Sequence, residues 1–383
     1  MTNRERFFAT IAGQAVDRAA FFPDITNWYA ARKTPPGQPR RHGSGGFIAD
    51  DDPINQASGD VPDELAGLTF LDIHRKYDWG LPVHVYNWFD EQYDGVEVAS
   101  KRRGRDRVTR IRCPKGELEK VQTLAADGSW APTAHPVKSL ADLEIVRYVV
   151  EHTRFVPRHE RVAEVLAAIG PLGVADIPLM RSPFGKLVHE YMGFEQVVYA
   201  LHDDRQAVVE FLEFQEAYDL ELAELAAGSP ARIVILSDHA DENLISPPCY
   251  REFCIPHYRK VNSILHQAGK IVSTHLDGNF KGYFPMLAET GFDLLDGCTP
   301  APMMNYEVEE LAEALPEKMS CYCGVPSTLL AQGLPDEEIV GFGRRILEAF
   351  GGRAILNIGD ILPTSGDIFQ LVGLGELARN FRP

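Results

Sequence analysis

Short apolar runs rich in β-branched residues recur along the second half of the chain. Each run is closed by Gly, Pro or Asp, which is typical of a strand buried in a parallel sheet. The runs lie at residues 173–180, 231–238, 270–276, 292–297, 318–325 and 353–360, and an earlier one lies at 19–24. Amphipathic stretches separate the later runs, at residues 204–228, 246–269, 305–315 and 335–352. Repeated β-α units of this kind predict an α/β fold with parallel strands.

Two architectures have this repeat, a closed (β/α)8 barrel and an open doubly wound sheet. No glycine-rich dinucleotide fingerprint follows an early strand, which weighs against the open sheet. Barrels of this type commonly hold a chain of 383 residues in one domain. We therefore predict a single (β/α)8 TIM barrel domain that spans residues 1–383.

The N-terminal part of the chain departs from the repeat. Thr2 and Glu5 have the spacing of a capping box and predict a short first helix. Residues 25–63 are rich in Pro, Gly and charge without a sustained period, which indicates a long loop. Residues 83–132 hold short alternating segments broken by turn sequences, so we expect a small antiparallel β-hairpin appendage there. Ser139 and Asp142 then begin the helix that leads into the repeat.

Composition and charge exclude several classes of function. With 45% hydrophobic and 24% charged residues the chain resembles an ordinary globular protein. A net charge of −17 disfavours nucleic-acid binding, and no apolar stretch is long enough to span a membrane. The six cysteines do not form the framework of a small secreted domain, and the charged N-terminus lacks the apolar core of a signal peptide. We expect reduced thiols and a cytoplasmic location.

Polar residues gather where the predicted strands end. These residues are Asp238, His239, His275, Asp277, Asp296 and Asp360. In a (β/α)8 barrel all such ends lie on one face, and that face carries the chemistry. Several carboxylates in one pocket repel one another unless a cation or protons intervene. Taken singly, each Asp has the alternative of capping the next helix and each His that of a structural hydrogen bond, so the pattern as a whole carries the prediction.

Several of these segments resemble the uroporphyrinogen decarboxylase superfamily. The resemblance runs along most of the chain and is strongest after Arg232, in the segments ISPPCYREFCIPHYRKV (245–261), GKIVSTHLDGN (269–279), LAETGFDLLDG (287–297), CGVPSTLL (323–330) and AILNIGDILP (354–363). It implies a single (β/α)8 barrel. The opening RERFFATIAGQAVDR (4–18) resembles the methyltransferase branch. The arginine-rich substrate motif of true uroporphyrinogen decarboxylases is absent from the matching residues 21–34, so porphyrinogen decarboxylation is not expected.

The resemblance also implies a metal site. The cobamide-dependent methyltransferases of this superfamily bind zinc through a His-x-Cys pair and a later Cys, and His275, Asp277 and Asp360 match these three positions. Carboxylates in place of thiolates imply a divalent metal with harder ligands, with zinc expected and manganese or iron also compatible. His239 is the candidate fourth ligand or general acid, and Asp238 and Asp241 are candidate catalytic residues that orient it. The alternative is that the three matched residues bind an organic substrate without metal.

The function implied is that of a metal-dependent methyltransferase or demethylase. It would act on a small O- or N-methyl compound and pass the methyl group to a corrinoid protein that carries a cobamide. The alternatives are a non-porphyrin decarboxylase of the same superfamily and a ligand-binding barrel without chemistry.

Three further groups of residues have two readings each. Cys298, Cys321 and Cys323 are expected to be buried, with a thiolate near the site as the alternative. The basic run 101–112 is either a solvated hairpin face or a docking strip for the acidic corrinoid partner. The aromatic residues Trp28, Tyr29, Trp79, Tyr86 and Trp88 either fill the core or line a substrate pocket.

Overall fold

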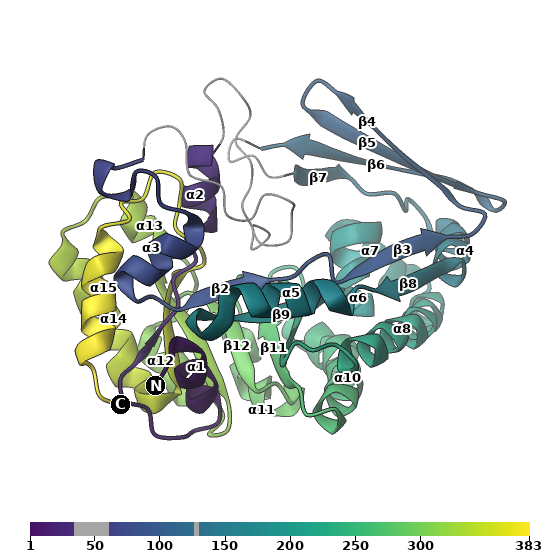
Figure 1. Ribbon diagram of the computed structural model, residues 1–383. Coiled ribbons are helices and arrows are strands. Elements are labelled where there is room, and N and C mark those ends of the chain that lie inside the picture. Colours follow the sequence, from purple (N-terminus) through teal and green to yellow (C-terminus); the bar gives the residue numbers. More distant parts are fainter. Residues whose placement is uncertain (34–60, 126–129) are drawn as a thin grey trace.

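The computed structural model describes residues 1–33, 61–125 and 130–383. Eight parallel strands form one curled sheet in the order β1-β14-β13-β12-β11-β10-β9-β2 (Figure 1). These strands are β1 (Ala20–Phe21), β2 (Leu81–His84), β9 (Gly173–Leu179), β10 (Ile233–Leu236), β11 (Ile271–His275), β12 (Leu294–Cys298), β13 (Ser320–Pro326) and β14 (Ala354–Gly359). The amide of Gly80 donates to the carbonyl of Phe21 at 2.9 Å and joins β1 to the start of β2. The predicted (β/α)8 TIM barrel is confirmed.

Helices surround the sheet, and those at residues 205–227, 255–267, 308–314 and 336–350 lie in the predicted amphipathic stretches. They are α1 (Asn3–Ile11), α2 (Thr26–Lys33), α3 (Phe70–Tyr77), α4 (Leu143–Glu151), α5 (His159–Ile169), α6 (Pro183–Lys186), α7 (Phe194–Asp203), α8 (Arg205–Ala227), α9 (Pro247–Cys249), α10 (Ile255–Gln267), α11 (Leu287–Thr290), α12 (Val308–Ala314), α13 (Ser327–Ala331), α14 (Asp336–Phe350) and α15 (Gln370–Asn380). The capping boxes at Thr2 and Ser139 are both present. None of the helices in the described residues is long and apolar enough to cross a bilayer.

The interior of the barrel is filled in layers by alternate residues of the strands. Phe7 of α1 plugs the N-terminal end, where it packs against a small cluster that is separate from the main core. The strand residues of this cluster are Ala20, Val174, Ile233, Leu294, Tyr322 and Ile355, with Phe22 just after β1. Because side chains alternate along a strand, the residues two positions further on face the same interior. Asp176, Asp296 and Asn357 occupy that next layer, so the interior changes from apolar to polar toward the C-terminal mouth.

An antiparallel appendage extends from the barrel. Strands β4 (Glu97–Arg103), β5 (Asp106–Cys113), β6 (Gly116–Leu124) and β7 (Trp130–Ala134) form a four-stranded sheet that projects at the upper right of Figure 1. A second small sheet pairs β3 (Phe89–Tyr93) with β8 (Thr153–Pro157). The hairpin region expected at 83–132 thus has its antiparallel strands further along the chain, because Val83 belongs to barrel strand β2.

The loop expected at residues 25–63 begins instead with helix α2. Ile25, Trp28 and Tyr29 are almost fully buried, and their spacing gives the helix one apolar face. This short helical periodicity was not recognised, because the sequence that follows it is rich in Pro and Gly. Residues 34–60 of the expected loop lie outside the described residues.

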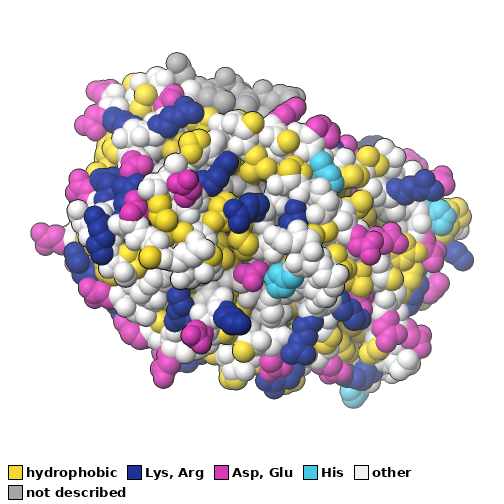
Figure 2. Space-filling view, turned by 60° about the horizontal axis from the view of Figure 1, so that its bottom comes forward, with side chains coloured by type: hydrophobic (Ala, Val, Ile, Leu, Met, Phe, Trp, Pro, Cys, Tyr) yellow, Lys and Arg dark blue, Asp and Glu magenta, His cyan; other side chains and the backbone are white. Residues whose placement is uncertain are grey.

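Charge is dispersed over the face of the molecule seen in Figure 2. Lys and Arg side chains alternate there with Asp and Glu, and no broad patch of one sign covers that face. The chain has an excess of acidic residues, but on this face they do not form one continuous patch.

Candidate metal centre at the barrel mouth

His275 is the central residue of the mouth. It ends β11, and its Nδ1 lies 2.9 Å from Oδ2 of Asp296 on the neighbouring strand. Its Nε2 then faces two further carboxylates, with Oδ2 of Asp360 at 3.6 Å and Oδ2 of Asp277 at 3.7 Å. Gly297 makes room for the ring, because a Cβ at this position would lie 2.7 Å from Cε1 of His275. Asp296 and Gly297, which lie next to each other within β12, thus orient the imidazole and leave space for it.

The electrostatics of the mouth favour charged forms of His275 and Asp277. Burial lowers the pKa of His275, but Asp360, Asp277 and Asp296 outweigh burial and hold the pKa well above its usual value. Burial raises the pKa of Asp277, but hydrogen bonds from His239 and His275 hold it well below its usual range. Desolvation inside the mouth raises the pKa of Asp360, against the opposing effect of His275. The group is a set of anions held together by positive charge.

His239 completes the set from the next strand. It follows β10 with a positive φ of 50°, an uncommon conformation for a residue other than glycine and one often found at functional sites. Its Nδ1 lies 2.9 Å from Oδ2 of Asp277, and its ring centroid lies 4.8 Å from that of His275. One ligand atom from each of His239, His275 and Asp277 can be chosen so that all three lie within 4.8 Å of one another.

The donor atoms fit a divalent cation. Two imidazoles and two carboxylates are ligands that zinc accepts and that harder metals such as manganese also accept. The hydrogen bond that Nδ1 of His275 donates to Asp296 is the kind of contact that fixes a metal-binding histidine in the orientation that presents Nε2. The structure therefore places His239, His275 and Asp277 close enough to share one ion, and Asp360 approaches this group through its contact with His275 at 3.6 Å.

Asp238 and Asp241, the candidate catalytic residues expected to orient His239, both make hydrogen bonds to neighbouring segments. Asp238 is fully buried, and it accepts hydrogen bonds from the amide and hydroxyl of Ser182 and from the hydroxyl of Tyr258. Asp241 accepts from Asn243 and from the amide of Asn279. Their contacts position the loops that carry His239 and Asp277 and leave little room for direct contact with a substrate.

A second histidine–carboxylate cluster lies on the other side of the mouth. His84 ends β2, and its Nδ1 lies 2.8 Å from Oδ2 of Asp176 on β9. Burial lowers the pKa of His84, but Asp176, Asp296 and Asp24 raise it to about 9. Burial also raises the pKa of Asp24, which lies in the segment after β1, to about 6 despite hydrogen bonds from Thr26. The mouth thus offers one imidazolium and one carboxyl group that titrates near neutrality.

Sequence reasoning missed this second cluster. Asp24 closes the first apolar run as Asp238 and Asp360 close later runs, so that signal was available. His84 ends a strand that was assigned to the hairpin region, and Asp176 lies inside its strand rather than at the end.

The cysteines and most of the aromatic residues serve the core. Cys298, Cys321 and Cys323 are fully buried in the main cluster, on the side of the strands opposite Tyr322. Burial raises the pKa of Cys298 and Cys321, so these two thiols stay protonated. Trp28, Tyr29, Trp79 and Trp88 are also buried. Tyr86 alone of the five named aromatics is largely exposed, and its ring lies 6.0 Å from His84.

Comparisons with known proteins agree with this architecture. Residues 127–365, well over half of the chain, match the family described as Uroporphyrinogen decarboxylase (URO-D). A solved methyltransferase from Methanosarcina mazei superposes with a TM-score of 0.63 at 16% identity, covering 99% of this chain and 98% of that one. A B12-independent methionine synthase from Shewanella sp. W3-18-1 gives a TM-score of 0.45 at 10% identity, covering 94% and 95%. No curated protein sequence matches the chain. At 16% identity the superposition on the Methanosarcina mazei protein supports the fold alone.

Proposed function

This chain belongs to the uroporphyrinogen decarboxylase (URO-D) family, and on that premise we propose that it is a metal-dependent methyltransferase or demethylase. Its substrate is a small compound with an O-methyl or N-methyl group, and its methyl acceptor is a cobamide on a corrinoid protein. The observation that carries the proposal is that carboxylate oxygens of Asp277 and Asp360 both lie within 3.7 Å of Nε2 of His275. The whole-chain likeness to a protein named as a methyltransferase supports it.

The metal is held by His275, Asp277 and Asp360, with His239 as the fourth protein ligand. A divalent cation at this position supplies Lewis acidity toward the oxygen or nitrogen that carries the methyl group. Zinc is the expected ion. Because carboxylates are harder ligands than thiolates, this set is less suited to activating a thiol, so the acceptor is not a thiol compound.

The remaining groups of the mouth position the ligands and supply charge. Asp296 keeps Nε2 of His275 directed at the centre, and Asp241 fixes the loop that carries Asp277. His84 contributes a second positive charge on the facing side of the mouth, where it can donate a hydrogen bond to a leaving oxygen as the methyl group departs.

The basic run 101–112 gives limited support to a docking role for the corrinoid partner. Arg110 and Arg112 form ion pairs with Glu119 and Glu117 of the adjacent strand, so their charges are largely used within the sheet. Lys101 and Arg103 remain on the exposed strand β4 as the groups available to an acidic partner.

A second candidate is a decarboxylase that acts on a substrate other than a porphyrinogen. The observation that favours it is the pair of groups Asp24 and His84, because a decarboxylase must deliver a proton to the carbon that loses carbon dioxide. In this reaction the His275 group would bind a substrate carboxylate instead of a methyl-bearing atom.

Metal content and methyl transfer test the proposal together. We expect protein purified without chelator to hold about one divalent ion per chain and His275→Ala to lose it while keeping its far-ultraviolet circular dichroism. The matched control is His266→Ala, which removes a surface histidine paired with Asp293 at 2.9 Å and should keep the metal. Wild-type protein should methylate cob(I)alamin from a panel of methoxy and N-methyl compounds. The proposal is refuted if the purified protein holds no metal and its activity does not change when zinc or manganese is added. Release of carbon dioxide without methyl transfer would favour the decarboxylase.

A further inference from the structure

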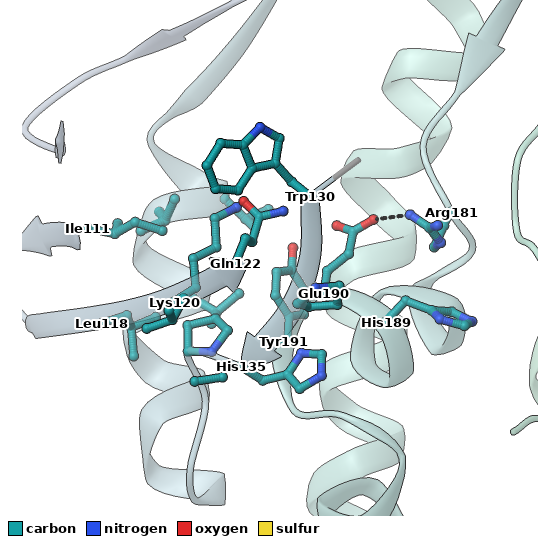
Figure 3. A pocket seen from close by; sticks show the side chains of 17 residues that line it. Ile111, Leu118, Lys120, Gln122, Trp130, His135, Arg181, His189, Glu190 and Tyr191 are labelled. Carbon is teal, nitrogen blue, oxygen red and sulfur yellow. Dashed lines mark hydrogen bonds and ion pairs between the residues drawn. The ribbon is translucent and has the colours of Figure 1, made fainter. Parts of the chain in front are cut away.

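A pocket of about 430 Å3 lies between the appendage and the barrel (Figure 3). One wall is the face of strands β5, β6 and β7, the opposite wall is helix α4, and the π-helical turn Leu187–Tyr191 closes the inner end. Most of this sheet precedes residue 127, where the match to the family begins. The pocket depends on the appendage, because β5, β6 and β7 supply one of its walls.

The pocket has apolar walls with a few polar groups. Leu118, Lys120 and Gln122 alternate along β6 and so share its pocket face, while Val146 and Val149 face them from α4. Trp130 lies at the top of the view in Figure 3, above Gln122 and Glu190. Volumes of a few hundred Å3 with apolar walls and convergent polar groups are typical of sites for small molecules.

Positive charge predominates around Trp130. The guanidinium of Arg107 lies 4.7 Å from the centre of the Trp130 ring and donates to Oε1 of Gln122 at 2.8 Å. The guanidinium of Arg102 lies 5.8 Å from the same ring. Lys120 lines the pocket and forms no ion pair with any described residue. This local excess of cations stands in a chain whose net charge is −17.

The single carboxylate among the lining side chains is already used. Oε1 of Glu190 accepts from Arg181 at 3.0 Å, and Figure 3 shows the two side chains directed at each other. Nε of Arg181 is buried and has no hydrogen-bond partner in the described structure. The pocket therefore has hydrogen-bond donors on Arg181 and Lys120 that lack a partner among the described residues. Its single carboxylate is already paired.

His189 connects the pocket with the metal centre. It lines the pocket at the inner end, and its Nε2 is buried without a partner among the described residues. Burial lowers the pKa of His189, and the charges of Arg181, Asp238 and His239 act on it as well. Arg181 also lines the pocket and precedes Ser182, whose amide donates at 2.8 Å to Asp238, the residue before His239, so the pocket adjoins the segment that carries His239.

We propose that this pocket binds the non-reacting part of the substrate, and that this part is a flat apolar group with a carboxylate. The apolar walls and Trp130 receive the flat group. Lys120 and the unused Nε of Arg181 receive the carboxylate, because an ammonium group without an ion-pair partner in an apolar pocket favours an anion over a neutral group of the same shape. That the pocket is a substrate site rests on the proposed function. That it binds an anion of this kind does not depend on the proposed function.

Calorimetric titration with 2-naphthoate and its neutral isostere 2-naphthamide tests the pocket. We expect 2-naphthoate to bind with one-to-one stoichiometry and about tenfold or more tighter than 2-naphthamide. Lys120→Met should weaken 2-naphthoate binding about tenfold and leave 2-naphthamide unchanged. Lys101→Met is the matched control, because Lys101 lies on the other face of the same sheet and lines a separate depression.

The expected binding of 2-naphthoate does not depend on the metal. His275→Ala protein should bind 2-naphthoate as wild type does, so loss of the metal proposal leaves this inference intact. Equal affinity for the two probes, absence of binding at millimolar concentration, or an equal effect of Lys120→Met and Lys101→Met would each overturn the inference. Trp130→Phe should retain binding and Trp130→Ala should weaken it, which distinguishes the pocket from a site elsewhere on the surface.

Discussion

Acid should loosen the barrel at the point where its first and second strands meet, through protonation of His74. This histidine lies in α3 with no exposed surface, and its Nδ1 donates to the carbonyl of Gly80 at 3.1 Å. The amide of Gly80 in turn donates to Phe21 and joins β1 to β2. Nε2 of His74 is buried and has no partner among the described residues, so the folded protein must keep that nitrogen unprotonated.

The size of the effect follows from the shift in pKa. Burial lowers the pKa of His74 from 6.5 to about 3, although the hydrogen bond to Gly80 opposes this. Because the unfolded chain keeps the higher value, it binds more protons between pH 3 and pH 6.5, and the free energy of unfolding falls as the pH falls through that window. With these two pKa values, one such group removes about 2 kcal/mol between pH 8 and pH 5.

Urea unfolding of wild type and His74→Gln at the two pH values isolates this group. Glutamine does not titrate and can still donate to Gly80, and all other titrating groups cancel in the comparison. We expect the stability advantage of wild type over His74→Gln to shrink by about 2 kcal/mol from pH 8 to pH 5. His202→Gln, which changes an exposed histidine on α7, should show no such change. Parallel pH profiles for wild type and His74→Gln would refute the assignment of a buried neutral imidazole.

Four further predictions concern the mouth and the appendage. The imidazole of His84 should titrate near pH 9 in ¹⁵N nuclear magnetic resonance, and a midpoint near 6.5 would contradict its contact with Asp176. Gly278→Ala should weaken metal binding about tenfold or more in a competitive titration, because its Cβ would lie 2.6 Å from that of Asp241 and would force the two ligand loops apart. Gly341→Ala, which has open space around it, is the control in the same titration. Zinc at a hundred times its dissociation constant should stabilise the protein by about 2.7 kcal/mol in thermal unfolding, and should do so equally in Cys323→Ala. Arg105→Glu should change the unfolding free energy by less than about 1 kcal/mol, because the side chain is exposed and its bond to Leu124 is a surface contact.

The repeat of apolar runs was sufficient for most of the barrel but not for its second strand. β2 is the sequence LPVH, which is short, contains a proline and is followed by polar and aromatic residues that resemble a hairpin. Its place in the sheet depends on pairing with β9, which is distant in sequence, and local patterns do not contain such pairings. Helix α2 was missed for a related reason, since its apolar face is complete only when the residues around it supply the rest of the core.

The two halves of the mouth show why only part of the site could be predicted. His275 and Asp277 are two residues apart at a strand end, so their joint position on one face follows from strand geometry alone. Asp24, His84 and Asp176 come from three strands, and they form one cluster because the barrel closes between β1 and β2. Closure brings the His84 imidazolium into the same mouth as the proposed metal ligands, and its positive charge would allow a substrate that bears negative charge to enter among several carboxylates. A mouth without His84 would repel the anionic substrate that the adjoining pocket is suited to bind. We therefore expect His84→Gln to raise KM for such a substrate more than it lowers kcat. A change confined to kcat would contradict this role.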